Sequence, residues 1–587
     1  MTEEDDPPQD PITLSAYITA QAVSEHFSSP NDRKISIRRL KDIGITKAYV
    51  EFYRGGLALP HGILSETRDS LEGEGITAAG GIATTYGEGF TAQSTGGSHW
   101  VCFSSEVTRS NLADAMRTGA RAFDTIIIDD FMCTDCECDL CIEGKGDRDW
   151  SEFRRDLLVR FASECLIGPA KDENPKVQLI IKYPQWYDRF HVYGYDVKRE
   201  SEIFDLVWVG TEIRDPRVDY VHQYQAFSNY AYISSLAGQK VAGAWFDHLW
   251  CYPDIYLEQA YQSVLAGAPE LVLFSYSPAK YDSLNPNTSA LIEQKDRLDH
   301  LRSAIAGTKH MGIEAYKPAN SDPGRETYLF DYLGMLGLPV LVTASRPRTS
   351  SIILSEHSLA DADIESYALN PPAGTCIMAT PGFLDGVAPE VLECFGLSDE
   401  PVGRKSFFTY RFDVRGRTEL AEENVIFNSF LRPESAEVAA KALSDRSYPI
   451  LTLNRHDDSK YIATSLQTFG HEPYHGSPSV TTAEPVSLVH LPEAFVNAMR
   501  AEIMAPLGIT LKAPAKIGLY LYSFPGSDKP CAAVVENFND QDASIMLETG
   551  LPLQPELKGS RSLRNGRKLE IELPGRELEL LSVYEIP

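Results

Sequence analysis

Short apolar segments alternate with helical patterns through the first half of the chain, and this alternation limits the fold more than any other feature. The segments are rich in β-branched residues, and a new one begins about every 30 to 50 residues, the length of one strand-helix unit. They lie at residues 14–20, 47–53, 76–83, 124–130, 177–183, 205–211, 241–247 and 271–276. Eight strands that alternate with helices over about 300 residues are typical of a (β/α)₈ TIM barrel.

A doubly wound open sheet is the other fold that such an alternation allows. It would normally have fewer strands, and no glycine-rich phosphate loop follows the first strand. After about residue 309 the segments become those of a smaller layered α/β domain, and from about residue 516 apolar and polar residues alternate with period two. We therefore predict an α/β chain with a barrel over residues 1–310, an α/β domain over 311–515 and a small β-sandwich over 516–587.

Charge and composition exclude several classes of partner. Acidic residues outnumber basic ones 83 to 54, which gives a net charge of −29. A field of this sign repels phosphate backbones, so we expect no nucleic acid partner. No apolar run reaches the roughly 18 residues that span a membrane, and the first residues do not form a secretory signal. Because the ten cysteines fit no disulfide framework, we expect a soluble protein in the cytoplasm.

Polar and aromatic side chains gather where the predicted strands end, and in a barrel the chemistry takes place at these carboxyl ends. Aromatic rings stack on sugar rings, and acids and amides bind sugar hydroxyls, so this mixture indicates a carbohydrate site. The ends carry few basic residues and no phosphate cradle, and we expect no organic cofactor. The side chains predicted to bind substrate are Glu51, Arg54, Asp129, Lys182, Trp186, Arg214, Trp245 and His248.

Three carboxylates are candidate catalytic groups: Asp130, Glu212 and Asp247. Neighbouring residues of a strand point to opposite faces, and Asp130 lies one step further into the loop than Asp129, so Asp130 is the expected rim residue. Burial of Glu212 at a strand end is costly unless it is functional or pairs with Arg214. Asp247 could instead form a salt bridge between loops. The sequence leaves open whether Glu212 or Asp247 is the partner of Asp130.

Four cysteines lie within nine residues directly after the fourth strand, in the pattern C-x₂-C-x-C-x₂-C. They are Cys133, Cys136, Cys138 and Cys141. Four thiols at this spacing predict a closed, structural zinc site, which leaves no open position for a catalytic water. An iron–sulfur cluster or reduced thiols are the alternatives. The spacing is compact enough to strain a four-thiolate site, so one ligand could come from elsewhere, such as Cys102 or His99.

The layout resembles the bacterial β-galactosidases that carry a trimerisation domain. In these enzymes an amidotransferase-like (flavodoxin-like) α/β domain and a small β domain follow the barrel, and cysteines bind zinc near the active-site face. Residues 328–337 look like the helix that opens the second domain. The resemblance implies a homo-oligomer, with a trimer as the expected state. Those enzymes place an Asn-Glu pair at strand four and a glutamate at strand seven, where this chain has Asp129-Asp130 and Asp247, so their catalytic glutamates do not carry over.

The placement of the carboxylates is more similar to that of the α-galactosidase-type clan, in which the strand-four aspartate is the nucleophile and the strand-six carboxyl group is the acid/base. The resemblance implies that Asp130 is the nucleophile, that Glu212 is the acid/base and that configuration is retained. We therefore expect a glycoside hydrolase that acts on small oligosaccharides or glycosides. The alternatives from other classes are a non-catalytic carbohydrate-binding or scaffold protein and a zinc-dependent hydrolase.

Overall fold

The computed structural model describes residues 11–97, 99–215, 223–467, 490–550, 553–555 and 567–583. These residues form two compact units. The first contains residues up to Asp215 together with Leu236–Ala306, and the second contains the remaining described segments. No helix among the described residues is both long enough and apolar enough to cross a lipid bilayer.

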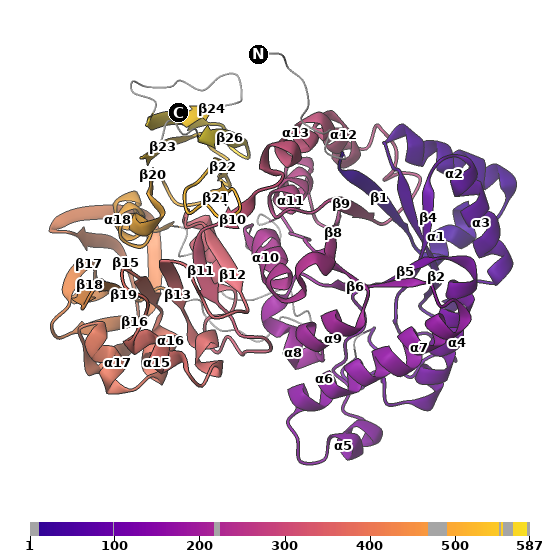
Figure 1. Ribbon diagram of the computed structural model, residues 1–587, viewed down its shortest axis with the longest axis horizontal. Coiled ribbons are helices and arrows are strands. Elements are labelled where there is room, and N and C mark those ends of the chain that lie inside the picture. Colours follow the sequence, from indigo (N-terminus) through magenta and orange to yellow (C-terminus); the bar gives the residue numbers. More distant parts are fainter. Residues whose placement is uncertain are drawn as a thin grey trace. The chain divides into compact units, whose positions relative to one another are not determined.

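Eight parallel strands close on themselves in the first unit, which confirms the predicted TIM barrel (Figure 1). The barrel is closed because β1 pairs with β2 on one side and with β9 on the other. A short strand, β3 (Leu57–Ala58), pairs antiparallel with the end of β2. In spatial order the barrel strands are β1 (Thr13–Ile18), β2 (Lys47–Arg54), β4 (Thr77–Ile82), β5 (Thr125–Ile128), β6 (Gln178–Tyr183), β7 (Leu206–Gly210), β8 (Val241–Asp247) and β9 (Glu270–Phe274).

Helices surround the barrel in the order that the alternation predicts (Figure 1). Helix α2 begins with ordinary capping chemistry: the Ser29 hydroxyl accepts a hydrogen bond from the amide of Asp32, and Pro30 is the first helical residue. The helices of this unit include α1 (Ala20–His26), α2 (Pro30–Asp42), α3 (His61–Gly73), α4 (Glu106–Ala122), α5 (Asp139–Lys145), α6 (Trp150–Phe161), α7 (Gly168–Glu173), α8 (Phe190–Tyr193), α9 (Val197–Ile203), α11 (Pro253–Leu265), α12 (Pro286–Glu293) and α13 (Lys295–Ile305).

Large side chains fill the inside of the barrel, so it is a packed core and not a channel. They include Tyr17, Tyr49, Ile127, Ile180, Trp208, Trp245 and Val272. Glycines provide the space for the largest of them: a Cβ at Gly81 would lie 2.8 Å from the Tyr17 ring, and one at Gly243 would lie 2.0 Å from the indole nitrogen of Trp208. A site in this unit must therefore lie above the core, at one end of the strands.

The amino ends of the strands hold a separate buried ion pair. Lys47, the first residue of β2, lies 2.9 Å from the carboxylate of Glu270, the first residue of β9. The same carboxylate accepts hydrogen bonds from the hydroxyls of Ser15 and Tyr49, each at 2.7 Å. This cluster joins three strands at the end of the barrel that, in this fold, serves stability.

The second unit contains the predicted layered α/β sheet, with five parallel strands followed by four antiparallel ones. The sheet order is β12 (Val340–Thr343), β11 (Ile313–Tyr316), β13 (Ser351–Leu354), β14 (Cys376–Ala379), β19 (Ser459–Thr464), β18 (Ser447–His456), β17 (Glu437–Leu443), β15 (Leu397–Val414) and β16 (Arg417–Pro433). The helices of this unit include α14 (Leu329–Met335), α15 (Ile364–Leu369), α16 (Pro381–Gly386), α17 (Pro389–Cys394) and α18 (Glu493–Ile503). The long hairpin β15–β16 is a feature that the sequence did not predict.

Two antiparallel sheets complete the second unit and agree with the predicted β domain. The first sheet orders β10 (Lys309–Met311), β21 (Ile517–Ser523), β22 (Ala532–Asn537), β26 (Leu578–Val583) and β24 (Leu553–Pro555). The second orders β20 (Ile509–Lys512), β23 (Ala543–Thr549) and β25 (Lys568–Leu573). Helix α10 (Gln225–Ala237) also packs largely in this unit, where the neighbouring Tyr224 stacks on Tyr520 at 5.3 Å between ring centroids. The domain boundaries at residues 310 and 515 stay a prediction.

Candidate functional site

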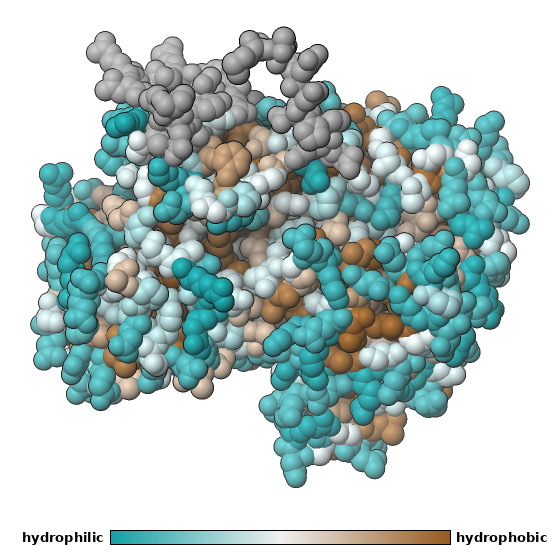
Figure 2. Space-filling view, viewed as in Figure 1, coloured by the Kyte–Doolittle hydropathy of each residue, from teal (hydrophilic) through white to brown (hydrophobic). Residues whose placement is uncertain are grey.

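The carboxyl ends of five barrel strands bring charged side chains together, and most of these side chains are buried. Their exposed fractions are 0% for Glu51, 3% for Asp129, 1% for Lys182, 3% for Glu212 and 4% for Asp247. Removing a charge from water costs several kcal/mol unless a partner compensates it. The partner of each group therefore indicates what that group can do. On the face drawn in Figure 2, hydrophobic residues come to the surface amid the mainly hydrophilic residues of this unit.

Lys182, at the end of β6, lies between two of the three candidate catalytic carboxylates. Its ammonium group donates to Oδ2 of Asp130 and, at 2.6 Å, to Oε1 of Glu212. The same nitrogen lies 5.0 Å from the ring centroid of Trp245. Burial by itself would lower the pKa of Lys182, but the neighbouring Asp130 and Glu212 raise it above its usual value. Lys182 is therefore a fully charged counter-ion for both carboxylates.

Glu212 has one oxygen free for chemistry. Its Oε1 accepts from Lys182, while no described residue donates a hydrogen bond to its buried Oε2. Burial raises the pKa of Glu212 to about 7, against the lowering effect of Lys182, and the charges of Asp130 and Asp247 add to the rise. Gly210 provides the space for this oxygen, because a Cβ there would lie 2.4 Å from it. Glu212 can thus hold a proton near neutral pH and has an oxygen from which to donate it.

Asp129 and Glu51 form a second ion network around Arg54. The guanidinium group of Arg54 donates to Oδ2 of Asp129 at 2.5 Å and to the carboxylate of Glu51 at 2.9 and 3.0 Å. Glu51 also accepts from the Tyr17 hydroxyl at 2.6 Å. The other oxygen of Asp129 accepts from the backbone amide of Asp130 at 2.8 Å. Both oxygens of Asp129 are therefore engaged, and one of them fixes the position of Asp130.

The environment of Asp129 keeps part of its population protonated near neutral pH. Burial and the charge of Asp130 raise the pKa of Asp129 to about 7, although Arg54 and Lys182 oppose the rise. Arg54 itself packs between two rings, with its central carbon 5.2 Å from the Phe131 centroid and 5.5 Å from that of Phe274. The sequence analysis missed Tyr17 and these two rings.

Asp247 forms the salt bridge that the sequence analysis gave as its structural alternative. Its two oxygens lie 3.1 and 3.2 Å from the two terminal nitrogens of Arg214, and Oδ1 also accepts from the amide of Leu249 at 2.8 Å. His248 follows, and its Nδ1 lies 3.0 Å from the carbonyl oxygen of Phe274. Burial and the charge of Lys280 lower the pKa of His248, so its imidazole is neutral at pH 7.

The two tryptophans predicted to bind sugar are largely buried. Trp186 is 6% exposed and packs against Phe190, Tyr193 and Tyr195, with ring centroids 5.5 to 5.7 Å away. Trp245 is 2% exposed and belongs to the barrel core. Neither residue presents an open ring face in this structure, and a role for them in sugar binding stays a prediction.

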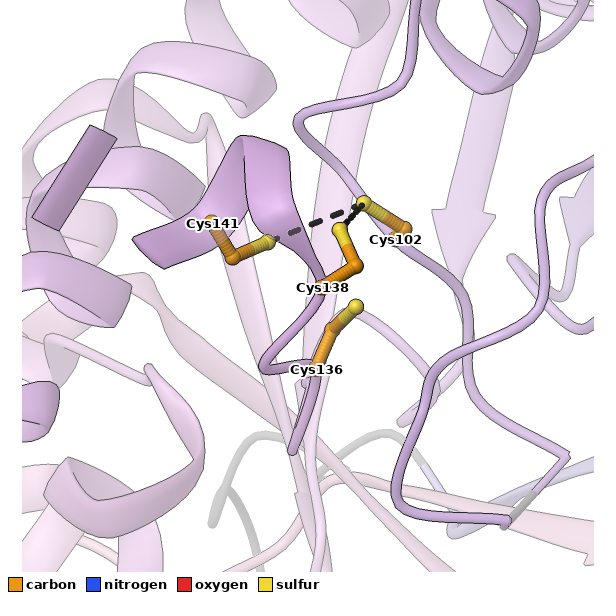
Figure 3. A group of neighbouring side chains, drawn as sticks. All are labelled: Cys102, Cys136, Cys138 and Cys141. Atoms are coloured by element: carbon orange, nitrogen blue, oxygen red, sulfur yellow. Dashed lines mark hydrogen bonds between the residues drawn. The ribbon is translucent and has the colours of Figure 1, made fainter. Parts of the chain in front are cut away.

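Four cysteine sulfur atoms lie within 4.8 Å of one another beside this rim (Figure 3). They belong to Cys102, Cys136, Cys138 and Cys141. The prediction that Cys133 completes the set is wrong: its thiol is buried elsewhere and lies 3.8 Å from the carbonyl oxygen of Asp130. Cys102, the alternative ligand that the sequence analysis named, takes its place. It reaches the cluster from the loop between β4 and α4.

The cysteine group fits a tetrahedral metal ion. The Cys102 sulfur lies 3.6 Å from that of Cys138 and 3.7 Å from that of Cys141. Four thiolates around Zn²⁺, each with a metal–sulfur bond of about 2.3 Å, would be about 3.8 Å apart. A metal held here would tie the loop after β4 to the loop after β5, which begins with Asp129 and Asp130.

Comparison with known families gives a match over the barrel. A family model described as the catalytic domain of a probable glycosyl hydrolase matches residues 5–311. An uncharacterized protein of Saccharolobus solfataricus is 26% identical over 390 residues, which cover 60% of this chain and 63% of the length of that relative.

Comparison with solved structures gives matches over nearly the whole chain. An α-L-fucosidase isoenzyme 2 from Paenibacillus thiaminolyticus matches with a TM-score of 0.66 at 10% identity, and the match covers 98% of this chain and 100% of that one. A β-galactosidase from the Antarctic haloarchaeon Halorubrum lacusprofundi matches with a TM-score of 0.63 at 12% identity, over 97% and 99% of the two chains. At these identities the likeness concerns the fold, and it agrees with the predicted order of barrel, α/β domain and β domain.

Proposed function

The chain belongs to the probable glycosyl hydrolase family, and we propose that it cleaves small oligosaccharides or glycosides. In this proposal Asp130 is the nucleophile and Glu212 is the acid/base. The observation that carries this proposal is the engagement of the other rim carboxylates. Asp129 and Asp247 have both oxygens bound to a guanidinium group or to a backbone amide. Glu212 keeps one oxygen without a donor among the described residues, and the side chain of Asp130 is 20% exposed.

The separation of the two carboxyl groups supports retention of configuration. Because one ammonium nitrogen contacts both groups, the two oxygens that it contacts lie no more than about 5 Å apart. Retaining glycosidases hold their two carboxyl groups about 5 to 5.5 Å apart, whereas inverting enzymes need roughly 6.5 to 9.5 Å to admit a water molecule. The shared contact with Lys182 keeps the two carboxyl groups close together, which supports the proposal of direct attack by Asp130.

The proposed reaction has two steps. In the first, Asp130 attacks the anomeric carbon and the glycosidic bond breaks, while Glu212 gives its proton to the leaving oxygen. In the second, water attacks the same carbon, the bond to Asp130 breaks, and Glu212 takes a proton from the water. Asp129 positions the nucleophile through its hydrogen bond to the Asp130 amide.

We also propose that the cysteine group holds a structural zinc ion. A set of four thiols leaves no position for a catalytic water, and the ion would supply a rigid link between two rim loops. All ten cysteines are free, which supports the proposal of a reducing, cytoplasmic location. The proposal that the chain forms a homo-oligomer, with a trimer as the expected state, rests on the resemblance of its layout to the β-galactosidases that carry a trimerisation domain.

Trapping of the intermediate tests the proposed pair directly. A panel of aryl glycosides identifies the preferred sugar, and the corresponding 2-deoxy-2-fluoro glycoside slows the second step. Peptide mapping of the labelled protein should then find the sugar on Asp130. A label on Asp247, or turnover without any label and with inverted product, would contradict the assignment. Sugar binding without any turnover would instead favour a non-catalytic carbohydrate-binding protein.

A further inference from the structure

One lysine serves two carboxylates whose charges change during the proposed reaction. Lys182 is 1% exposed, and its nitrogen contacts both Asp130 and Glu212. In the free enzyme Asp130 must be an anion and Glu212 must be protonated. In the glycosyl-enzyme Asp130 is a neutral ester and Glu212 is the anion. The negative charge therefore moves from one partner of Lys182 to the other.

We propose that Lys182 is the shared counter-ion of this moving charge: it neutralises Asp130 before the first step and Glu212 before the second. This inference rests on the proposed function, because it takes the roles of the two carboxylates from it. The three side chains together carry no net charge in either state. A buried site gains most from such neutrality, since an uncompensated charge there costs several kcal/mol.

Among the described residues, no other cation forms an ion pair with Asp130 or Glu212. The charged groups that the structure describes around the pair include Asp129, Asp247, Arg54 and Arg214, with Glu51 beside Arg54 and Lys280 near Asp247. Arg54 is held by Asp129 and Glu51, and Arg214 is held by Asp247 on both of its terminal nitrogens. Without Lys182, the anion formed in either state would lie beside further carboxylates. Lys182 is thus a positioning residue that acts through the two catalytic groups.

The second step provides the sharpest test. In Lys182→Met, Glu212 of the glycosyl-enzyme loses its counter-ion, stays protonated and is a poor base. With a 2,4-dinitrophenyl glycoside, whose leaving group needs little protonation, we expect a burst followed by turnover about 100-fold slower than that of the wild type. Intact mass should show the glycosyl-enzyme accumulating at steady state. Azide, which needs no general base, should accelerate the slow phase.

The matched control is Lys47→Met, which removes the lysine of the ion pair at the opposite end of the barrel. It is expected to lower thermal stability without a burst and without a change in pH dependence. Lys182→Arg keeps the charge and should recover part of the activity that Lys182→Met loses. A Lys182→Met enzyme that accumulates no intermediate and keeps the wild-type pH profile would overturn the inference.

A direct measurement covers the case in which Lys182→Met does not fold. Carbon-13 NMR of labelled glutamate carboxyl groups, with Glu212→Gln for assignment, follows the pKa of Glu212 in the wild type and in Lys182→Gln. We expect this pKa to rise by at least one unit in Lys182→Gln, in the free protein and in the 2-fluoroglycosyl-enzyme. Equal values would overturn the inference alone. If the label never attaches to Asp130, the proposed function fails and takes the inference with it.

Discussion

Each carboxylate at the rim differs from its neighbours in the partner that it has, and the partner decides its chemistry. Asp247 is held by Arg214 through two contacts, and Asp129 by Arg54 and a backbone amide. Glu212 shares Lys182 but keeps Oε2 without a donor among the described residues. Asp129 and Asp247 are therefore held through both oxygens, whereas Glu212 and the partly exposed Asp130 are the two acids that we propose react.

The pH dependence should follow the proton on Glu212. Burial raises the pKa of Glu212 to about 7, so the protonated acid is present below that pH and is lost as the pH rises through it. We expect kcat/KM for glycosides with poor leaving groups to fall above about pH 7. In Glu212→Gln this alkaline limb should disappear, and only activated aryl glycosides should be hydrolysed well. An Asp247→Asn enzyme that loses the limb while Glu212→Gln keeps it would reverse the assignment.

Gly210 should be indispensable to the acid although it has no functional group. A Cβ at this position would lie 2.4 Å from Oε2 of Glu212 and 2.8 Å from the carbonyl oxygen of Tyr183. Gly210→Ala must therefore displace the carboxyl group, and we expect kcat for poor leaving groups to fall about 100-fold, with a smaller loss for dinitrophenyl glycosides. Gly73→Ala is the control, because nothing lies within 4 Å of its Cβ. Equal activity of the two variants would contradict the role given to Gly210.

At the scale of the element, the loops after β4 and β5 meet at their cysteines. Cys102 precedes α4, whereas Cys136, Cys138 and Cys141 follow β5. The loop after β5 also carries Asp129 and Asp130 at its start. A metal at the cysteine group would therefore hold Asp130, the proposed nucleophile, in place from outside the reaction site.

Metal content should follow Cys102 and not Cys133. We expect about one zinc per chain by elemental analysis. Replacing Cys102 and Cys138 by serine should remove it and lower the free energy of unfolding by at least about 2 kcal/mol. Cys133→Ser should keep the full zinc content, because its thiol lies outside the group. If Cys133→Ser loses zinc and Cys102→Ser keeps it, the ligands are instead Cys133, Cys136, Cys138 and Cys141, as the sequence alone suggested.

The elements that could be predicted are those whose signal is local. The barrel strands were found because fully buried parallel strands are continuous apolar runs, such as Ile126-Ile127-Ile128. The hairpin β15–β16 was missed because runs of polar residues, such as Ser398-Asp399-Glu400 and Glu422-Glu423-Asn424, interrupt the alternation along both strands. Cys102 could only be offered as an alternative, since it meets Cys138 across 36 residues of chain and spacing carries no information at that distance.

The pairing of the rim groups could not be predicted either, because the partners are far apart in the sequence. The choice between Glu212 and Asp247 depends on which cation each one meets. The contact between Asp130 and Lys182 spans 52 residues, and that between Lys182 and Glu212 spans 30. Strand-end positions predict which residues reach the rim, but only the closed barrel determines which of them touch.

At the scale of the whole molecule, the barrel is followed by an α/β sheet and two antiparallel sheets. All three candidate catalytic residues lie in the barrel unit. Two solved glycosidases share this arrangement over nearly their full length. We propose that this second unit serves assembly.

The assembly prediction is a homo-oligomer, and a trimer is the expected state. Light scattering coupled to size exclusion should give about three times the chain mass at micromolar concentration. Phe408, Tyr410 and Leu420 are more than half exposed on the hairpin β15–β16, so a triple replacement by serine should shift the population toward the monomer if the hairpin lies at the interface. A monomer at micromolar concentration in the wild type would contradict the prediction.

The barrel closes by pairing β1 with β9, so its first strand must wait during synthesis until its last strand has been made. Thr13 pairs with Glu270, so the first strand has only one of its two neighbours until more than 250 further residues have been made. At the usual rates of synthesis this takes on the order of 10 to 50 seconds. During that interval β1 presents an apolar edge to the crowded cell. Nascent chains that stop before residue 270 should therefore aggregate or recruit chaperones, whereas chains released after β9 should not.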